Sequence, residues 1–166
     1  MSARFGRLPW LWLSLLVFVI DQVSKFYFDN ALTLYQQIVV IPDYFSWTLA
    51  YNTGAAFSFL AGESGWQRWL FALIAIVISA VLVVWLKRLK PDETWLAMAL
   101  ALVLGGALGN LVDRVVFGHV VDFVLVHWQH RWYFPAFNVA DAAITLGAIL
   151  LALDMFKSNK SGETTP

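Results

Sequence analysis

Four long apolar stretches constrain this chain more than any other feature of its sequence. They run from Leu8 to about Phe28, from Trp69 to Leu86, from Trp95 to Gly109, and from about Phe137 to Phe156. An α-helix needs about 20 mostly apolar residues to cross the hydrocarbon core of a bilayer. The second stretch meets this need outright, and the others do so when polar residues at one end are included. We therefore predict four transmembrane helices.

The composition agrees with a membrane protein and excludes several functions. Of the 166 residues, 60% are hydrophobic and only 13% are charged, whereas a soluble domain is about one quarter charged. The formal net charge of +0 gives no sign of nucleic-acid binding. The absence of Cys excludes disulfides and a cysteine nucleophile. We expect no cofactor and no metal, because His127 and His130 have no third ligand at a suitable spacing.

The basic residues predict how the chain is oriented in the membrane. They flank the apolar stretches as Arg4 and Arg7, then Lys87, Arg88 and Lys90, then Lys157 and Lys160. Residues 29–67 contain no Lys or Arg. Basic loops stay in the cytoplasm, so we predict that both termini are cytoplasmic and that the loops 29–66 and 117–136 face outward. The first stretch continues into Asp21 and Lys25 rather than a small-residue cleavage site, which indicates a retained helix and not a cleaved signal peptide.

The domain organisation follows from these spans. Residues 1–156 are predicted to form one membrane-embedded domain, and residues 157–166 a disordered cytoplasmic tail. Within the outward loops, Asp43–Tyr51 and Val120–Phe134 alternate and are rich in aromatic residues, which favours strands. Gly62–Gln67 is predicted to form a short interfacial helix. The fold class is therefore an all-α polytopic membrane protein with a small extracytoplasmic β-sheet cradle.

Polar residues within the apolar stretches gather at one depth. Ionisable groups in a membrane span are costly and usually functional. In the predicted topology the residues at the outer ends of three helices are Asp21, Lys25, Asn110, Asp113, Arg114, Asn138 and Asp141. Their common depth indicates a shared site. Structural roles remain open for some of them, since Asp21 and Lys25 are also spaced to form a simple i, i+4 ion pair.

Asp122 and Asp141 differ from the other acidic residues because both lie in apolar sequence without a basic neighbour. If they meet, two carboxylates at ~4 Å repel each other by ~4 kcal/mol at an effective dielectric near 20. One of them then keeps its proton near neutral pH. Two carboxylates that share one proton form an acid–base pair able to activate a water molecule.

The sequence resembles the bacterial lipoprotein signal peptidases, also called signal peptidase II. The matching blocks are Asp21–Lys25, Tyr51–Phe57, Gly105–Asn110 with Asp113 and Arg114, Val121–Phe123, and Phe137–Asp141. They cover almost the whole chain in the family's order. The resemblance implies an aspartic endopeptidase of the bacterial inner membrane. It would remove the signal peptide of a prolipoprotein by cutting before a Cys that carries diacylglycerol.

The resemblance also implies a role for each site residue. The catalytic pair would be Asp122 and Asp141. The substrate-binding residues would be Asn52, Gly54, Asn110, Arg114 and Asn138, and the supporting residues Asp21, Lys25, Asp113 and Ala140. The implied partners are diacylglyceryl-modified signal peptides, membrane lipids and globomycin-type peptide inhibitors, and we expect a monomer. Phe57 and Phe59 are expected to cover the scissile bond.

Two other functions compete with a peptidase on the residues alone. A proton-coupled transporter also needs intramembrane Asp residues, but it would place ionisable groups near the midplane and show inverted halves. A membrane scaffold with a partner-binding sheet would account for the aromatic loops, but not for the two Asp residues in apolar sequence.

Overall fold

The computed structural model describes residues 6–54, 65–129 and 131–162. Its helices are α1 (Leu11–Ala31), α2 (Trp66–Arg88), α3 (Thr94–Val116) and α4 (Val139–Gly162), and a 3₁₀ turn, η2 (Leu8–Trp10), leads into α1. Among the described residues, four helices are long and apolar enough to cross a membrane. The predicted four-helix membrane fold is confirmed, and the chain is a multi-pass membrane protein.

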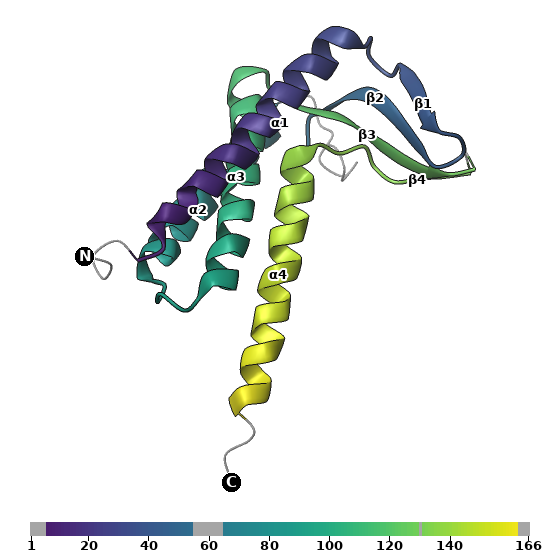
Figure 1. The fold of residues 1–166 in the computed structure, drawn as a ribbon. Helices are drawn as coiled ribbons and strands as arrows, with labels where there is room; N and C mark the ends of the chain where they lie inside the picture. Colours follow the sequence, from purple (N-terminus) through teal and green to yellow (C-terminus); the bar gives the residue numbers. More distant parts are fainter. Residues whose placement is uncertain (1–5, 55–64, 130, 163–166) are drawn as a thin grey trace.

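Helix α3 lies at the centre of the helical part and packs against α1, α2 and α4 (Figure 1). In the most apolar 18-residue segment of α3, 56% is buried inside the protein, compared with 17–22% in the corresponding segments of the other three helices. Small residues permit this close packing. A Cβ on Gly105 would lie 2.7 Å from the Ser14 carbonyl oxygen, and one on Gly106 would overlap the Ala140 carbonyl oxygen. Glycine therefore lets the backbones of α1 and α4 approach α3 directly.

The strands form one antiparallel sheet in the order β1-β2-β3-β4. They are β1 (Gln37–Ile41), β2 (Phe45–Asn52), β3 (Val120–Trp128) and β4 (Trp132–Tyr133). The strands predicted in the two outward loops are thus confirmed, whereas β1 was not predicted. The sheet projects from one end of the helices, and the start of α1, the end of α4 and the α2–α3 turn lie at the other end (Figure 1). In the β2–β3 register Ala50 lies opposite Asp122, and the Asp122 side chain contacts Asn138 at the start of α4.

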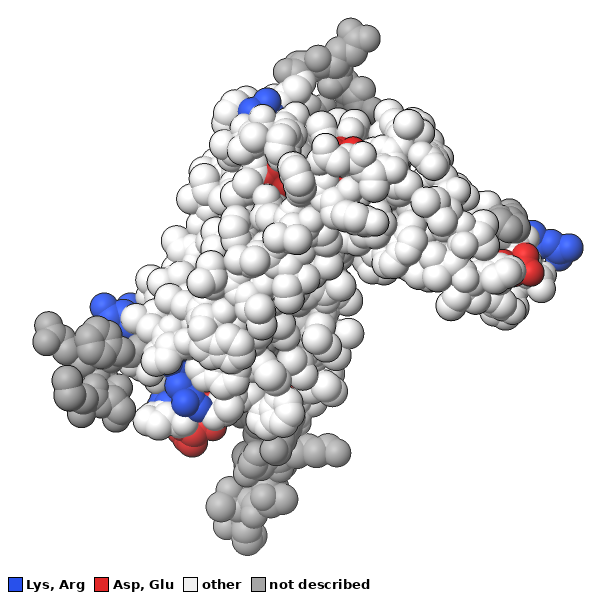
Figure 2. Space-filling view, turned by 45° about the horizontal axis from the view of Figure 1, so that its top comes forward, with Lys and Arg blue, Asp and Glu red and all other residues white. Residues whose placement is uncertain are grey.

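The surface of the helical part is apolar. Figure 2 shows few charged residues over the middle of the molecule, with the blue and red residues near its ends and at the tip of the sheet. Large side chains on α1 are widely exposed, for example Val23 at 63% and Phe26 at 74%. Such a surface suits contact with lipid, where exposed apolar side chains carry no penalty.

Three expectations lie wholly or partly beyond what the structure describes. Residues 62–64, half of the predicted interfacial helix Gly62–Gln67, lie outside the described residues, and its last two residues begin α2. Phe57 and Phe59 also lie outside them. Helix α4 continues past Phe156 to Gly162, so the boundary between the membrane domain and a tail at residues 157–166 stays a prediction.

Candidate active site

A buried polar network lies where the sheet meets the helices. It draws on α1, α3, β3 and the start of α4, and its members are Asp21, Gln22, Lys25, Asn110, Asp113, Asp122, Asn138 and Asp141. Several are almost inaccessible: Asp21 and Asn138 are 0% exposed, and Asp122 is 2% exposed. The structure therefore brings together the polar residues for which the sequence predicted a shared site.

The first turn of α4 holds Asp141 in a fixed orientation. Asn138 precedes the helix, and its Oδ1 accepts a hydrogen bond from the backbone N–H of Asp141 at 2.9 Å. In return the backbone N–H of Asn138 donates to Oδ2 of Asp141 at 3.3 Å. This reciprocal pair is a capping box, which satisfies N–H groups that a helix start otherwise leaves without a partner.

Asn138 also connects the two aspartates. Its Nδ2 donates to Oδ1 of Asp122 at 2.7 Å and to the backbone oxygen of Val121 at 3.2 Å. Asn110 contacts Asp141 from the other side, because its Nδ2 donates to Oδ1 of Asp141 at 2.7 Å. The two amides are themselves linked, with Asn138 Nδ2 lying 3.3 Å from Asn110 Oδ1. A single chain of side-chain amides thus joins Asp122 to Asp141.

Lys25 fixes the direction of this chain. Its Nζ donates to Oδ1 of Asn110 at 2.9 Å, so the other end of that amide, Nδ2, is the end that faces Asp141. Lys25 is only 3% exposed. Two carboxylates form ion pairs with this ammonium group, Asp21 Oδ2 at 2.8 Å and Asp113 Oδ2 at 3.0 Å. The i, i+4 ion pair between Asp21 and Lys25 is present, and it belongs to the site rather than standing apart from it.

Asp21 anchors the start of α4 to α1. Its Oδ1 accepts a hydrogen bond of 2.8 Å from the backbone N–H of Ala140, in the first turn of α4. Gly109 makes room for this contact, since a Cβ there would overlap Oδ2 of Asp21. A carboxylate at a helix N-terminus is favoured by the free N–H groups and by the helix dipole.

Gln22 belongs to the network but was not predicted. Its Nε2 donates to Oδ1 of Asp113 at 2.9 Å and to the Gly109 carbonyl oxygen at 3.2 Å. One signal pointed to it: Gln22 is a polar residue inside a membrane span, between the two ionisable residues of the first helix. Asp113 is held on its other side by the backbone N–H of Val121, at 3.2 Å from Oδ2.

The environment of Asp122 favours its protonated form. Burial raises the pKa of the Asp122 carboxyl from 3.8 to about 7, with the nearby carboxyl of Asp141 acting in the same direction. Hydrogen bonds from Asn52 and Asn138 and the charge of Lys25 act in the opposite direction. Near neutral pH, Asp122 can therefore exchange a proton, as an acid–base group must.

Asn52, Gly54 and Arg114 lie at the edge of the network. The N–H of Gly54 donates to Oδ1 of Asn52 at 2.9 Å. Gly54 has φ +92°, and a Cβ there would lie 2.6 Å from Cε2 of Phe71. The Arg114 guanidinium stands 5.3 Å from the centre of the Phe71 ring and donates to the Asn110 backbone oxygen at 3.1 Å. These residues form a rim beside the two aspartates, with Asn52 hydrogen-bonded to Asp122.

Comparison with known families decides the assignment. The model of one family, signal peptidase (SPase) II, matches residues 13–157. This chain belongs to the signal peptidase II family. The matched region contains every residue of the buried network.

Relatives within the signal peptidase II family are close. A lipoprotein signal peptidase of Pseudomonas syringae pv. tomato is 81% identical over 163 residues, which are 98% of this chain and 94% of the relative. One from Pseudomonas aeruginosa is 81% identical over 160 residues, covering 96% and 95% of the two chains. Family membership favours a peptidase over the transporter and scaffold alternatives.

Solved structures agree with the fold. A bacterial membrane enzyme determined by the in meso method at 2.3 Å has a TM-score of 0.82 and 28% identity, and covers 100% of this chain and 99% of its own. A second, determined at 1.9 Å, has a TM-score of 0.79 and 30% identity over 95% of this chain and 99% of its own. The arrangement of four helices and a projecting sheet is thus shared with membrane enzymes.

Proposed function

We propose that this chain is an aspartic endopeptidase that removes signal peptides from prolipoproteins, cutting before a Cys that carries diacylglycerol. One observation supports the chemistry most strongly. Asn138 donates its side-chain amide to Asp122 and its backbone amide to Asp141, so one residue holds both carboxyls. The relatives in Pseudomonas, named lipoprotein signal peptidases, support the substrate class.

The two carboxyls would divide the work of hydrolysis. Asp141 would act as the base, because both its oxygens accept hydrogen bonds and it lies at the positive end of α4. Asp122 would carry the proton at rest, since burial raises its pKa to about 7. This assignment goes beyond the sequence, from which the protonated member of the pair could not be chosen.

The reaction then needs no covalent intermediate with the protein. Asp141 removes a proton from water, and the water oxygen attacks the scissile carbonyl carbon while Asp122 gives its proton to the carbonyl oxygen. The resulting tetrahedral species collapses, and its hydroxyl proton returns to Asp122. The C–N bond breaks, and the leaving nitrogen takes the proton held by Asp141. Each carboxyl thus ends the cycle as it began.

The remaining residues would bind and position the substrate. Asn52, Gly54 and Arg114 lie on the rim, where they would contact the peptide backbone or a peptide inhibitor of the globomycin type. Asn110 would both bind substrate and orient Asp141. Asp21, Lys25, Asp113 and Ala140 would support the site through the contacts that join α1 and α3 to the start of α4.

The location of the site fits a signal peptide. We propose the bacterial inner membrane, with both termini in the cytoplasm and the sheet on the outer face, because Arg7 and the basic cluster Lys87, Arg88 and Lys90 lie at the end of the helices opposite the sheet. The apolar helix of a signal peptide ends near the outer leaflet, so its cleavage point would lie beside Asp122 and Asp141. We expect the monomer to be sufficient, since both aspartates come from one chain.

The decisive experiment uses the purified full-length protein with a diacylglyceryl-modified lipobox peptide. We expect cleavage before the modified Cys by the wild type and none by Asp122→Asn or Asp141→Asn. Asp43→Asn is the matched control, because Asp43 lies in the turn between β1 and β2 with φ +67°, which Asn tolerates. Cleavage retained in either site variant would contradict the aspartic mechanism. Equal cleavage of a peptide with unmodified Cys would contradict the substrate class only.

A further inference from the structure

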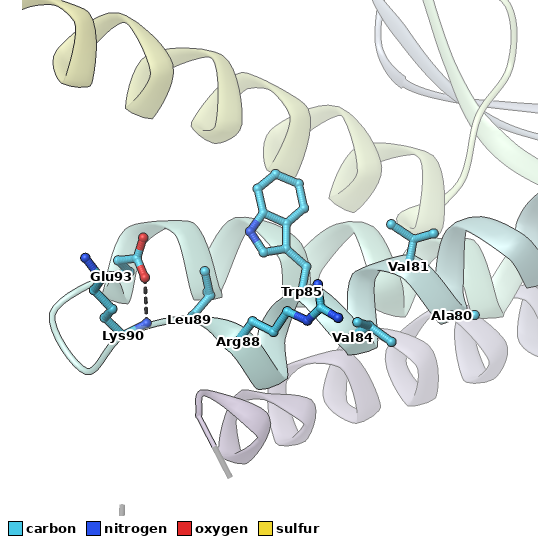
Figure 3. Close-up of a pocket in the computed structure, with 8 residues that line it drawn as sticks. All are labelled: Ala80, Val81, Val84, Trp85, Arg88, Leu89, Lys90 and Glu93. Atoms are coloured by element: carbon cyan, nitrogen blue, oxygen red, sulfur yellow. Dashed lines mark hydrogen bonds between the residues drawn. The ribbon is translucent and has the colours of Figure 1, made fainter. Parts of the chain in front are cut away.

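A groove of about 680 Å³ lies at the end of the molecule opposite the sheet (Figure 3). It is formed by the last turns of α2 and the turn that leads into α3. This volume is in the range of sites that hold small ligands, about 300–1,000 Å³. No residue of the candidate active site lines it, so it requires an explanation of its own.

One side of the groove is apolar and open to the surroundings. Val81, Val84 and Trp85 follow one another at the i, i+3, i+4 spacing that places side chains on one helix face. They are 56%, 48% and 44% exposed. In a membrane protein this face meets lipid chains, and a Trp at the end of a span is typical of the interface between hydrocarbon and headgroups.

The other side of the groove is polar. Arg88 stands one turn beyond Val84, and its side chain runs back toward Val84 (Figure 3). Lys90 follows in the turn, and its backbone N–H donates to the Glu93 carboxylate. The side chains of Arg88 and Lys90 form no ion pair with any residue that the structure describes. Two cations and one carboxylate leave the groove with a net charge of +1.

We propose that this groove binds an anionic glycerophospholipid with the charge of phosphatidylglycerol. Its acyl chain would lie against Val81, Val84 and Trp85, and its phosphate would contact Arg88, while Lys90, whose side chain extends away from Arg88 (Figure 3), would add positive charge at the end of the groove. A guanidinium binds phosphate oxygens through two parallel hydrogen bonds, and basic pockets at the membrane surface are suited to such headgroups. The single negative charge of the lipid balances the net charge of the groove. This inference does not depend on the proposed peptidase activity.

A simpler interpretation makes a different prediction. Cations in the last turn of a helix interact favourably with its dipole whether or not a ligand binds. Lys87 and Arg88 share that turn of α2, but Lys87 does not line the groove. A general charge effect would therefore treat Lys87 and Arg88 alike, whereas a built site requires Arg88 and Lys90.

The test measures lipid binding by native mass spectrometry of the full-length protein in detergent. Phosphatidylglycerol is titrated beside phosphatidylethanolamine and phosphatidylcholine with the same acyl chains. We expect preferential binding of phosphatidylglycerol, weakened roughly tenfold or more in Arg88→Gln/Lys90→Gln, since each cation near a membrane surface contributes about fivefold in affinity. Lys87→Gln, which removes one charge from the same turn as Arg88 but outside the groove, should change the affinity by less than about twofold. The thermal unfolding temperature of each variant shows whether it is folded.

A fluorescence measurement locates the lipid. Brominated phosphatidylglycerol should quench the wild type more than brominated phosphatidylcholine does. Because the chain has nine Trp residues, the part due to Trp85 is obtained by subtracting the signal of Trp85→Phe. Equal binding of the three lipids, an equal loss in Lys87→Gln, or quenching unchanged in Trp85→Phe would overturn the proposal. A change of oligomeric state in Arg88→Gln/Lys90→Gln would also overturn it, because a second copy would then occupy the groove.

Discussion

Asn138 and Asp141 cap one another across the first turn of α4, each accepting a hydrogen bond from the other's backbone N–H. The same Asn138 side chain also reaches Asp122 at 2.7 Å. Asn138 thus both caps α4 and links the two carboxyls through its hydrogen bonds. Its two roles can be separated, because the oxygen of the amide serves the cap and the nitrogen serves Asp122.

Substitution of Asn138 should separate these roles. Asn138→Ser keeps a side-chain oxygen for the Asp141 N–H but removes the donor to Asp122. We expect little loss of thermal stability and a large loss of kcat, on the order of 100-fold, as for removal of one preorganised donor. Asn138→Ala removes the cap as well and should cost about 1 kcal/mol more in unfolding free energy. Wild-type kcat in Asn138→Ser would contradict the role of the donor.

The raised pKa of Asp122 predicts how stability depends on pH. The carboxyl titrates near 3.8 in the unfolded chain and at about 7 in the folded protein. Between these values the folded state holds a proton that the unfolded state has lost, so stability falls as pH rises. The loss amounts to about 4 kcal/mol across this window. Above pH 7 the variant Asp122→Asn should therefore unfold several degrees higher than the wild type.

Thermal unfolding of the detergent-solubilised protein from pH 4 to 8 measures this effect. The difference between Asp122→Asn and the wild type should grow with pH and level off above about pH 7. Asp43→Asn is the control, and its curve should run parallel to that of the wild type. A constant difference at every pH would show that the Asp122 carboxyl does not titrate in this window.

Gly54 should not tolerate a side chain, both because its φ is +92° and because Phe71 lies close to it. A Cβ would also lie 2.6 Å from the Phe71 ring, and the shift needed to avoid it would move Asn52, which Gly54 binds. Gly65 is the matched control, because it has φ +64° but a Cβ added there would meet no described heavy atom within 4 Å. We expect Gly65→Ala to lose only about 1 kcal/mol from backbone strain.

Gly54→Ala should lose more stability than Gly65→Ala and should also lower kcat/KM. Chemical denaturation and peptide cleavage measure the two effects. The double variant Gly54→Ala/Phe71→Leu should regain part of the activity, because a smaller side chain makes room for the new methyl group. Equal stability of the two single variants would show that the contact with Phe71 carries no cost.

Lys25 should be essential to both stability and activity. Lys25→Met leaves Asp21 and Asp113 buried without their cation, and loss of one partner from a buried ion pair costs about 3–5 kcal/mol. It also removes the shorter of the two hydrogen bonds to Oδ1 of Asn110, which leaves the 3.3 Å contact with Asn138 to orient this amide toward Asp141. Lys87→Met, an exposed lysine in α2, should change stability by less than about 0.5 kcal/mol. Cleavage of the lipobox peptide and thermal unfolding test both expectations.

The transmembrane helices and the polar cluster could be predicted because a bilayer restricts which residues a spanning helix can contain. Apolar length identifies a helix, and a polar residue in such a helix stands out against its neighbours. The alternation of apolar and polar residues likewise identified β2 and β3, since both strands bury part of their side chains and expose the rest. β1 was not predicted, because Gln37–Ile41 is a run of mostly apolar residues without polar–apolar alternation. Every residue in it is exposed, and its pairing with β2 is what makes it a strand.

The connections within the site could not be predicted from the sequence. Asp21 and Ala140 lie 119 positions apart, and nothing in either segment indicates that a carboxylate on α1 caps α4. The contact depends on how closely α1, α3 and α4 approach, which Gly109 permits only in the folded protein. The direction of the Asn110 amide is similarly a product of its distant partner Lys25.

The bond between Asp21 and Ala140 also bears on biosynthesis. Helix α1, which leaves the ribosome before α4, holds the start of α4, so the two aspartates cannot acquire all their partners until α4 has been inserted. A nascent or truncated chain that ends before α4 carries only Asp122. We expect such a chain to be inert toward neighbouring membrane proteins, so that activity begins only when α4 has been inserted.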